Sequence, residues 1–292
     1  MSEIVFITAG TIDMASSRYR AYWPARYIEN SAVYPIQHVS QSGLPIGKDT
    51  KAVVFQKFAN ADMMKFCHDS GVKVVWDVCD PSWWFQPDQC ADLLNYTDVV
   101  TASSKALLDD LAGVYQGVED ECAFIPDAFE PEHYREAGDY HRHPAAGILR
   151  FVWYGHENNR FTLLPYIPEL ERLANLYDIQ VTLTIVDSRP NDNWASNYIN
   201  IEHQRWTLDT EVAVIASHDL AFLPDYPGRW GKLKSDNRAI HAGYCGRHVY
   251  IPGRTDMALD ALVQFDPTCT DKGKLEKYAA KTIAKQWKAV LA

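Results

Sequence analysis

The sequence predicts an α/β protein made of two domains, each built around a parallel β-sheet. The chain has 292 residues, a length that fits two domains of about 140 residues better than one compact core. Short apolar runs alternate with helical patterns, which is typical of βα units around a parallel sheet. This alternation is broken at the polar, turn-forming stretch 136–147 and then starts again.

The expected strands are short runs rich in Val, Ile and Phe. In the first domain they lie at 4–9, 52–57, 72–78, 98–103 and 122–128. In the second domain they lie at 149–155, 180–187, 198–203, 219–224 and 248–253. Ligands of open parallel sheets bind beyond the carboxyl ends of the strands, so functional side chains are expected in the loops after these runs.

The last segment, 271–292, is expected to form an amphipathic helix. Its apolar residues follow one another at spacings of mostly three and four, and they are Leu275, Tyr278, Ala279, Ile283, Trp287 and Leu291. Such a helix needs an apolar groove in which to lie.

Composition and charge exclude several classes of protein. Hydrophobic residues make up 47% of the chain, and the net charge of −10 argues against a general nucleic-acid-binding surface. The six cysteines stand singly, which indicates reduced thiols of a cytoplasmic protein. No run of about 18 apolar residues occurs, so no membrane-spanning segment is expected.

A basic loop follows the expected strand 219–224. Arg229, Lys232 and Lys234 precede a short helical pattern that Ser235, Asp236 or Asn237 can cap and that Gly246 can close. The free N–H groups and the positive dipole of a helix start, together with nearby cations, form an anion site that suits a diphosphate. The alternative is a solvated loop without a ligand.

Several segments resemble the GT-B glycosyltransferases, particularly the retaining enzymes that use nucleotide-diphosphate sugars. They are "SSRYRAYWPARYI" (16–28), "VVWDVCDPSWW" (74–84), "DVVTASSKALLDDL" (98–111), "KSDNR" (234–238) and "HAGYCGRHV" (241–249). The resemblance implies two Rossmann-like domains facing across a cleft, the acceptor mainly on the first and the donor mainly on the second. It also implies a last helix that crosses back. The expected parts are therefore 1–145, 146–270 and a helix 271–292 that packs on the first domain.

The resemblance and the basic loop together give a set of donor-binding residues. They are Arg160, Lys232, Lys234, Ser235, Asn237, Arg238 and His241. His241 stands where the family usually has the glutamate that grips the donor ribose. A neutral imidazole still offers one hydrogen bond to a ribose hydroxyl. The alternative for His241 is a buried helix histidine.

The first domain supplies the expected catalytic and acceptor-binding residues. Arg18, Asp77 and Asp80 are the catalytic candidates, since a carboxylate after strand 72–78 can orient an acceptor hydroxyl or accept its proton. Arg20, Trp83 and Trp84 are the acceptor-binding candidates. The alternatives are surface charges, capping carboxylates and core tryptophans. Two carboxylates without a third ligand do not make a metal site, so no metal is expected.

The expected function is transfer of a sugar from a nucleotide-diphosphate donor to an unidentified acceptor, with retention and with neither metal nor cofactor. Segment 124–129 has Asp127 and Ala128 where the family has Asn and Gly. Together with His241, this leaves open a non-catalytic nucleotide- or glycan-binding protein. A modified base of DNA is a third possibility, with nucleic acid as the acceptor only. P-loop, zincin, dinucleotide-binding and serine-hydrolase motifs are missing from the sequence.

Overall fold

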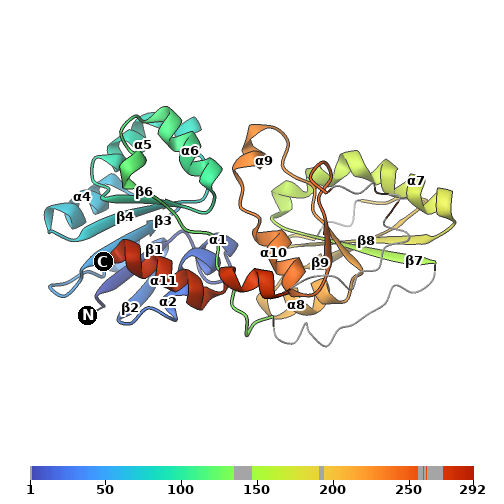
Figure 1. Ribbon diagram of the computed structural model, residues 1–292, viewed down its shortest axis with the longest axis horizontal. Helices are drawn as coiled ribbons and strands as arrows, with labels where there is room; N and C mark the ends of the chain where they lie inside the picture. Colours follow the sequence, from blue (N-terminus) through green and yellow to red (C-terminus); the bar gives the residue numbers. More distant parts are fainter. Residues whose placement is uncertain (1, 135–146, 191–193, 256–258, 260, 262–271) are drawn as a thin grey trace. The chain divides into compact units, whose positions relative to one another are not determined.

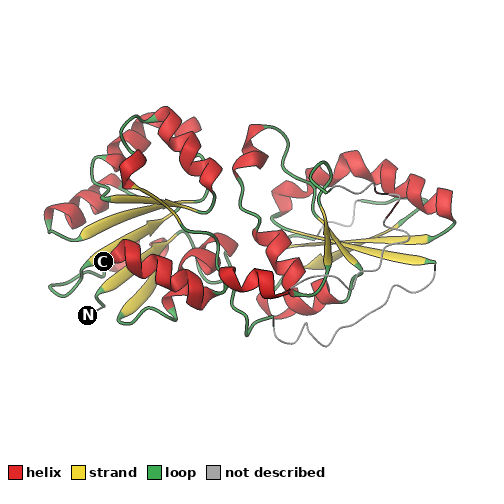
Figure 2. Ribbon diagram, viewed as in Figure 1, coloured by secondary structure: helices red, strands yellow, loops and turns green. Residues whose placement is uncertain are grey.

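The computed structural model describes residues 2–134, 147–190, 194–255, 259, 261 and 272–292. The chain divides into two compact units. The first unit contains Met1–Glu130, Arg229–Ser235 and Lys277–Ala292, and the second unit contains Pro131–Gly228 and Asp236–Glu276. Figure 1 shows the elements of each unit in chain order by colour, and Figure 2 shows that both combine helices with one sheet.

The first unit is built on a parallel sheet with the strand order β2-β1-β3-β4-β5-β6. Its strands are β1 (Ile4–Thr8), β2 (Ser31–Pro35), β3 (Ala52–Gln56), β4 (Lys73–Val78), β5 (Val99–Ala102) and β6 (Cys122–Phe124). The strand β2 was not expected, because it is a sheet edge with only partly buried residues and a proline at its end.

Helices cover both faces of this sheet. They are α1 (Ala15–Ser17), the π-helix η1 (Arg18–Tyr22), α2 (Trp23–Ala25), α3 (Ile36–Ser42), α4 (Ala61–Asp69), η2 (Ser82–Trp84), α5 (Pro87–Leu94), α6 (Lys105–Val114), η3 (Glu119–Glu121), α9 (Arg229–Leu233) and α11 (Ala280–Leu291). Because side chains alternate along a strand, Val5 and Ile7 share one apolar core with α3, α4, α5 and α6. Phe6 points the other way, with its ring 5.5 Å from that of Trp287 in α11.

The second unit is built on a parallel sheet with the strand order β11-β10-β7-β8-β9. Its strands are β7 (Ile148–Tyr154), β8 (Gln180–Asp187), β9 (Asn200–Arg205), β10 (Leu220–Phe222) and β11 (His248–Tyr250). Its helices are η5 (Glu157–Tyr166), α7 (Ile167–Tyr177), α8 (Leu208–Ala216) and α10 (Asn237–Tyr244). Gly246, with φ +70°, follows the end of α10 as the sequence predicts.

The division of the chain differs from the expected one in two places. The first stretch of the first unit ends at Glu130, not at residue 145, and the turn-forming stretch up to residue 146 lies largely outside the described residues. The basic segment Arg229–Ser235 was expected in the second domain, but it belongs to the first unit.

The C-terminal segment consists of the 3₁₀-helix η7 (Lys272–Tyr278) and α11. One face of α11 is buried in the first unit, including Ile283 and Trp287, which have no exposed surface. Ala280 donates a backbone hydrogen bond of 2.7 Å to the carbonyl of Phe129. Within the described ranges, no helix combines the length and the apolar character needed to cross a membrane.

We expect Trp287→Ala to lower the free energy of unfolding of the first unit by about 3–5 kcal/mol, because it removes a buried indole and leaves a cavity against Phe6. Urea unfolding followed by circular dichroism measures this. The control is Lys281→Ala on the exposed face of the same helix, which should change stability by less than about 0.5 kcal/mol. Equal stability of the two variants would show that α11 does not belong to the core of this unit.

Candidate functional site

The order of the strands in each sheet indicates where a ligand is expected to bind in each unit. In the first sheet β1 pairs with β2 on one side and β3 on the other. In the second sheet β7 pairs in the same way with β8 and β10. Where successive connections run in opposite directions from one strand, a crevice opens beyond the carboxyl ends of the strands. Candidate ligand sites therefore lie between the loops after β1 and β3, and between those after β7 and β10.

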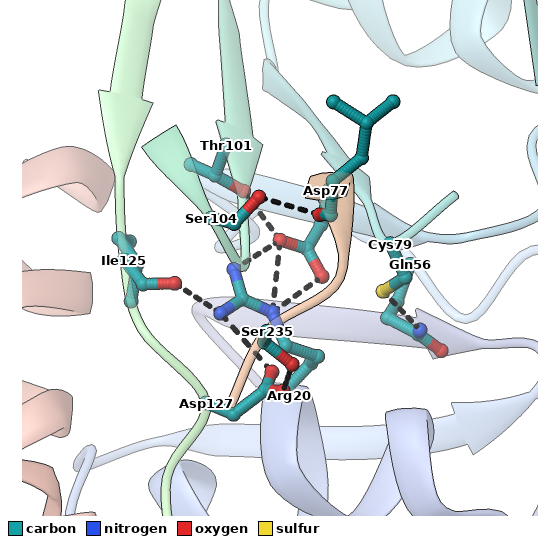
Figure 3. A network of polar contacts seen from close by, with 10 residues as sticks. Arg20, Gln56, Asp77, Cys79, Thr101, Ser104, Ile125, Asp127 and Ser235 are labelled. Atoms are coloured by element: carbon teal, nitrogen blue, oxygen red, sulfur yellow. Dashed lines mark hydrogen bonds and ion pairs between the residues drawn. The ribbon is translucent and has the colours of Figure 1, made fainter. Parts of the chain in front are cut away.

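A buried ion pair dominates this edge of the first unit (Figure 3). Arg20, from the helix after β1, donates from Nε to both oxygens of Asp77 in β4, at 3.2 and 3.1 Å. Its Nη2 reaches Asp77 Oδ1 at 2.5 Å, and the hydroxyl of Thr101 in β5 donates to the same oxygen at 2.7 Å. Neither charged side chain has exposed surface. The structure thus brings together two predicted residues and directs each toward the other.

The charge of Arg20 is fixed by these partners. Burial lowers the pKa of the guanidinium, but Asp77 and, less strongly, Asp127 outweigh burial and hold the pKa above its ordinary value. Nη1 of Arg20 lies 3.6 Å from Oδ1 of Asp127 and also donates to the carbonyl of Ile125. Arg20 therefore connects the loop after β1 with β4 and with the segment after β6.

The segment Arg229–Ser235 is attached to the same edge by polar contacts. The hydroxyl of Ser235 donates to Oδ2 of Asp127 at 2.5 Å, and that of Ser104 donates to the carbonyl of Leu233 at 2.6 Å. Ser104 also begins α6, where its oxygen accepts a backbone hydrogen bond of 3.1 Å. These contacts explain why this segment belongs to the first unit.

Asp80 lies between two lysines in the loop after β4. Nζ of Lys57 is 2.9 Å from Oδ2, and Lys234 forms an ion pair with Oδ1. Partial burial raises the pKa of Asp80, but Lys234 and then Lys57 outweigh it, so the pKa lies below its ordinary value. The predicted catalytic carboxylate and the predicted donor-binding lysine are thus partners within one unit.

An aromatic cluster stands next to this pair. Oδ2 of Asp110 accepts hydrogen bonds from the indoles of Trp83 and Trp84, at 2.8 and 2.7 Å. Arg229 pairs with the same carboxylate and lies 5.0 Å above the ring of Trp84. The buried Trp83 fits its alternative reading as a core residue, whereas Trp84 is only partly buried.

Two further aromatic residues of this cluster were not predicted. The ring of Trp230 lies 5.8 Å from that of Trp84 and 5.7 Å from that of Phe85, which is 69% exposed. In the sequence, the available signal was the position of Phe85 directly after "SWW". Nothing marked Trp230 as its partner, because sequence spacing does not reveal packing between residues 145 positions apart.

Arg18 is buried, and its hydrogen bonds stabilise the loop after β1. Its Nη1 donates to the carbonyls of Ile12 and Asp13, at 2.9 and 3.1 Å, and its Nη2 donates to the hydroxyl of Tyr19 at 3.0 Å. These bonds fix the course of the loop between β1 and η1. The predicted catalytic arginine therefore orders backbone at the edge of the sheet.

In the second unit, Arg238 ties the start of α10 to the end of β7. Its Nη1 donates to the carbonyl of Tyr154 at 3.3 Å, and the hydroxyl of Tyr154 donates back to the carbonyl of Arg238. Gly155 follows directly. A Cβ atom there would lie 3.3 Å from the ring of Trp153, a tight contact that favours glycine, and at an ordinary contact distance of 3.5 Å from Nη1 of Arg238.

The N-terminus of α10 has no side-chain cap. Asp236 occupies the capping position, but its side chain accepts no bond from the helix start and instead lies 2.8 Å from Nη1 of Arg254. Arg254 also binds both oxygens of Asp225, in the loop after β10, at 2.5 and 2.7 Å. Arg254 was not predicted from the sequence, since no motif marks it.

Arg160 and His241, two predicted donor-binding residues, lie in buried polar clusters of the second unit. Arg160 pairs with Asp187 at the end of β8 through two nitrogens. His241 is 1% exposed, with Nδ1 3.6 Å from Oε1 of Glu211. Glu211 also accepts from the indole of Trp206 at 3.1 Å. His241 thus has a carboxylate as a neighbour within the second unit.

The remaining predicted residues divide between the units. Lys232 is exposed on α9, and together with Lys234 and Ser235 it belongs to the first unit. Asn237 begins α10 and belongs, with Arg238, to the second unit. Within the part of the chain that the structure describes, no group of three or more His, Cys, Asp or Glu side chains is placed to hold a metal ion.

Known proteins resemble this chain in structure but not in sequence. No protein-family model matches the sequence, and no curated protein sequence matches it either. A glycosyltransferase from Rickettsia africae superimposes with a TM-score of 0.64 and 9% identity, over 99% of this chain and 98% of that one. The α,α-trehalose 6-phosphate synthase of Burkholderia multivorans gives 0.60 and 10%, over 100% and 96%.

A third similar structure is an α-glucosyltransferase solved with UDP and a 13-mer DNA that contains an A:G mismatch. It superimposes with a TM-score of 0.52 and 9% identity, over 98% of this chain and 91% of that one. The chain has the GT-B fold. The two parallel sheets with surrounding helices confirm the fold class predicted from the sequence, and identities this low show the fold alone.

The ion pairs of Asp80 predict a specific dependence of stability on pH. A carboxylate whose pKa is lowered on folding stabilises the folded state above its ordinary pKa of about 3.9, and this contribution is lost as the pH falls through the lower, folded value. We therefore expect Asp80→Asn to lose less stability than the natural chain between pH 6 and pH 2.5, measured by urea unfolding.

The control is Asp49→Asn, which changes an exposed carboxylate that has no ion pair among the described residues. It should keep the pH dependence of the natural chain. If Asp80→Asn behaves like this control, the two lysines do not stabilise Asp80 in solution.

Proposed function

We propose that this chain is a glycosyltransferase that moves a sugar from a nucleotide-diphosphate donor to an acceptor hydroxyl, with retention and without a metal ion. The observation that carries the proposal is the start of α10, which has no side-chain cap and lies at the crevice between β7 and β10 with Arg238 beside Gly155. The GT-B fold supports it, because glycosyltransferases share that fold.

Three properties of this helix start suit a diphosphate. Its N–H groups and dipole attract anions, and Asp236, the carboxylate closest in sequence, is held by Arg254. Arg238 adds a fixed positive charge with several donors in one plane. Gly155 has no side chain, and Nη1 of Arg238 lies close to the backbone there, at the end of β7. We assign donor binding to Asn237 and Arg238, with Arg254 as a positioning residue.

In the proposed reaction, the bond between the anomeric carbon and the diphosphate oxygen breaks while the acceptor oxygen bonds to that carbon. The leaving diphosphate takes the electron pair, and the acceptor hydroxyl loses its proton. Arg238 and the start of α10 would stabilise the developing charge, which is usually the largest catalytic contribution. The acceptor proton would go to the leaving diphosphate.

The other predicted residues take narrower roles in this proposal. Arg18, Arg20 and Asp77 are buried. Arg18 bonds to the loop after β1 and Arg20 bonds to Asp77 in β4, so the three residues position the edge of the first sheet. Lys234 becomes available to an anion only when its ion pair with Asp80 opens. Lys232 and Trp84 are accessible enough to contact a substrate directly.

A non-catalytic nucleotide-binding protein with this fold is the second candidate. It is favoured by His241, Asp127 and Ala128, which depart from the residues that the glycosyltransferases have at these positions. Release of nucleoside diphosphate from a panel of nucleotide sugars by the purified chain distinguishes the two. Binding of the nucleotide without any release, with and without added acceptors, would favour the second candidate.

We expect Arg238→Gln to weaken binding of UDP by about 10- to 100-fold, since a charge-assisted hydrogen bond contributes about 1.5–3 kcal/mol. Isothermal titration calorimetry measures the affinity. The matched control is Arg172→Gln on α7, whose side chain is 47% exposed and pairs within its own helix. Equal affinities of both variants for UDP, and for the other nucleoside diphosphates, would refute the diphosphate site.

We also expect the release of nucleoside diphosphate to survive treatment with EDTA, because Arg238 and the helix start would neutralise the leaving group in place of a metal ion. Initial rates before and after the chelator test this. Loss of activity that Mg²⁺ or Mn²⁺ restores would contradict metal independence and would make Asp80 a candidate ligand.

A further inference from the structure

The helix α11 presents two chemically different faces. Its apolar face is buried in the first unit through Ile283, Ala284 and Trp287. Its opposite face carries Lys281, Lys285 and Lys288, all exposed. At spacings of four and three residues these lysines form one stripe, about 10 Å long at 1.5 Å per residue. None of the three forms an ion pair with a described residue.

The charge of this region is opposite to that of the chain. Residues 272–292 contain six lysines and a single acidic residue, Glu276, in a chain with a net charge of −10. Glu276 accepts a hydrogen bond of 3.2 Å from the hydroxyl of Tyr244. From Lys277 to the last residue there is no acidic side chain. The positive charge on the outer face of α11 is therefore not neutralised within its own segment.

The geometry points to a peripheral contact between this lysine face and the anionic headgroups of a lipid bilayer. Each basic residue close to an anionic bilayer surface contributes about 1 kcal/mol to binding, and α11 presents three of them on one face. The apolar face of α11 is already buried in the first unit, so the helix does not insert, and the contact is electrostatic. Because the three lysines form a straight stripe, all of them can contact a flat surface at the same time.

The composition of the face favours a bilayer over nucleic acid. Residues 272–292 contain lysine but no arginine. Arginine forms the paired, planar hydrogen bonds with which proteins position themselves on phosphates and bases, whereas lysine acts as a point charge. The exposed face of α11 also has no aromatic side chain on which a base could stack, since Trp287 is buried.

The test uses the full chain and vesicles of phosphatidylcholine with 30% phosphatidylglycerol, in a sedimentation assay at low salt. We expect binding to these vesicles, little binding to pure phosphatidylcholine, and a steep loss of binding as the salt concentration rises and the Debye length falls below about 10 Å. Each lysine near an anionic surface contributes about a fivefold change in affinity, so Lys281→Gln, Lys285→Gln and Lys288→Gln together should weaken binding by about 100-fold.

The matched control combines Lys48→Gln, Lys65→Gln and Lys105→Gln, three exposed lysines elsewhere in the first unit. It makes the same change in net charge and should bind within about threefold of the natural chain. All six positions are exposed, so both triple variants should fold, which circular dichroism verifies.

Three results would overturn the proposal. The first is the absence of binding to the anionic vesicles at low salt. The second is an equal loss of binding in both triple variants. The third is lysine-dependent binding of a 20-base-pair DNA duplex without binding to vesicles, which would assign the face to nucleic acid. The affinity for UDP is measured for the same variants, and the α11 variant should keep it. A failure of the proposed lipid binding can therefore be distinguished from a failure of the proposed transferase activity.

Discussion

The buried pair between Arg20 and Asp77 organises the functional edge of the first unit. Two opposite charges without solvent contact are tolerated only when hydrogen bonds satisfy both, and here Thr101 and the carbonyl of Ile125 complete the set. The loop after β1 and the ends of β4, β5 and β6 are thereby fixed relative to one another. Every candidate residue of this unit except Lys232 lies on one of these loops or is bonded to one.

The same constraint decides which parts of the chain belong together. Asp127 lies close to Arg20 and accepts a bond from Ser235, while Asp80 and Asp110 pair with Lys234 and Arg229. Three carboxylates of the first unit thus engage three residues of one short segment. Most of the cations for which the basic loop was predicted to bind an anion are neutralised by these carboxylates. The proposed diphosphate site is therefore formed by α10 and Arg238.

Local chemistry could be predicted from the sequence, and long-range pairing could not. The central strands were predictable because residues such as Val53, Val54 and Phe55 are completely buried and therefore uniformly apolar. Gly246 was predictable because a helix end favours a residue with positive φ. By contrast, Ser235 and Asp127 are separated by 108 positions, and nothing in the composition of either segment marks the bond. For the same reason, the carboxylate neighbour of His241 went unforeseen.

The division of the chain has a consequence for its synthesis. The first unit needs Met1–Glu130, then Arg229–Ser235, and finally Lys277–Ala292, so it is not complete until the ribosome has made this last segment. Until then the face of β1 that Trp287 covers stays open, with Phe6 uncovered. Domains of ordinary multidomain proteins fold one after another from the N-terminus. Here the second unit, from Pro131 to Glu276, has all its residues available before the first one does.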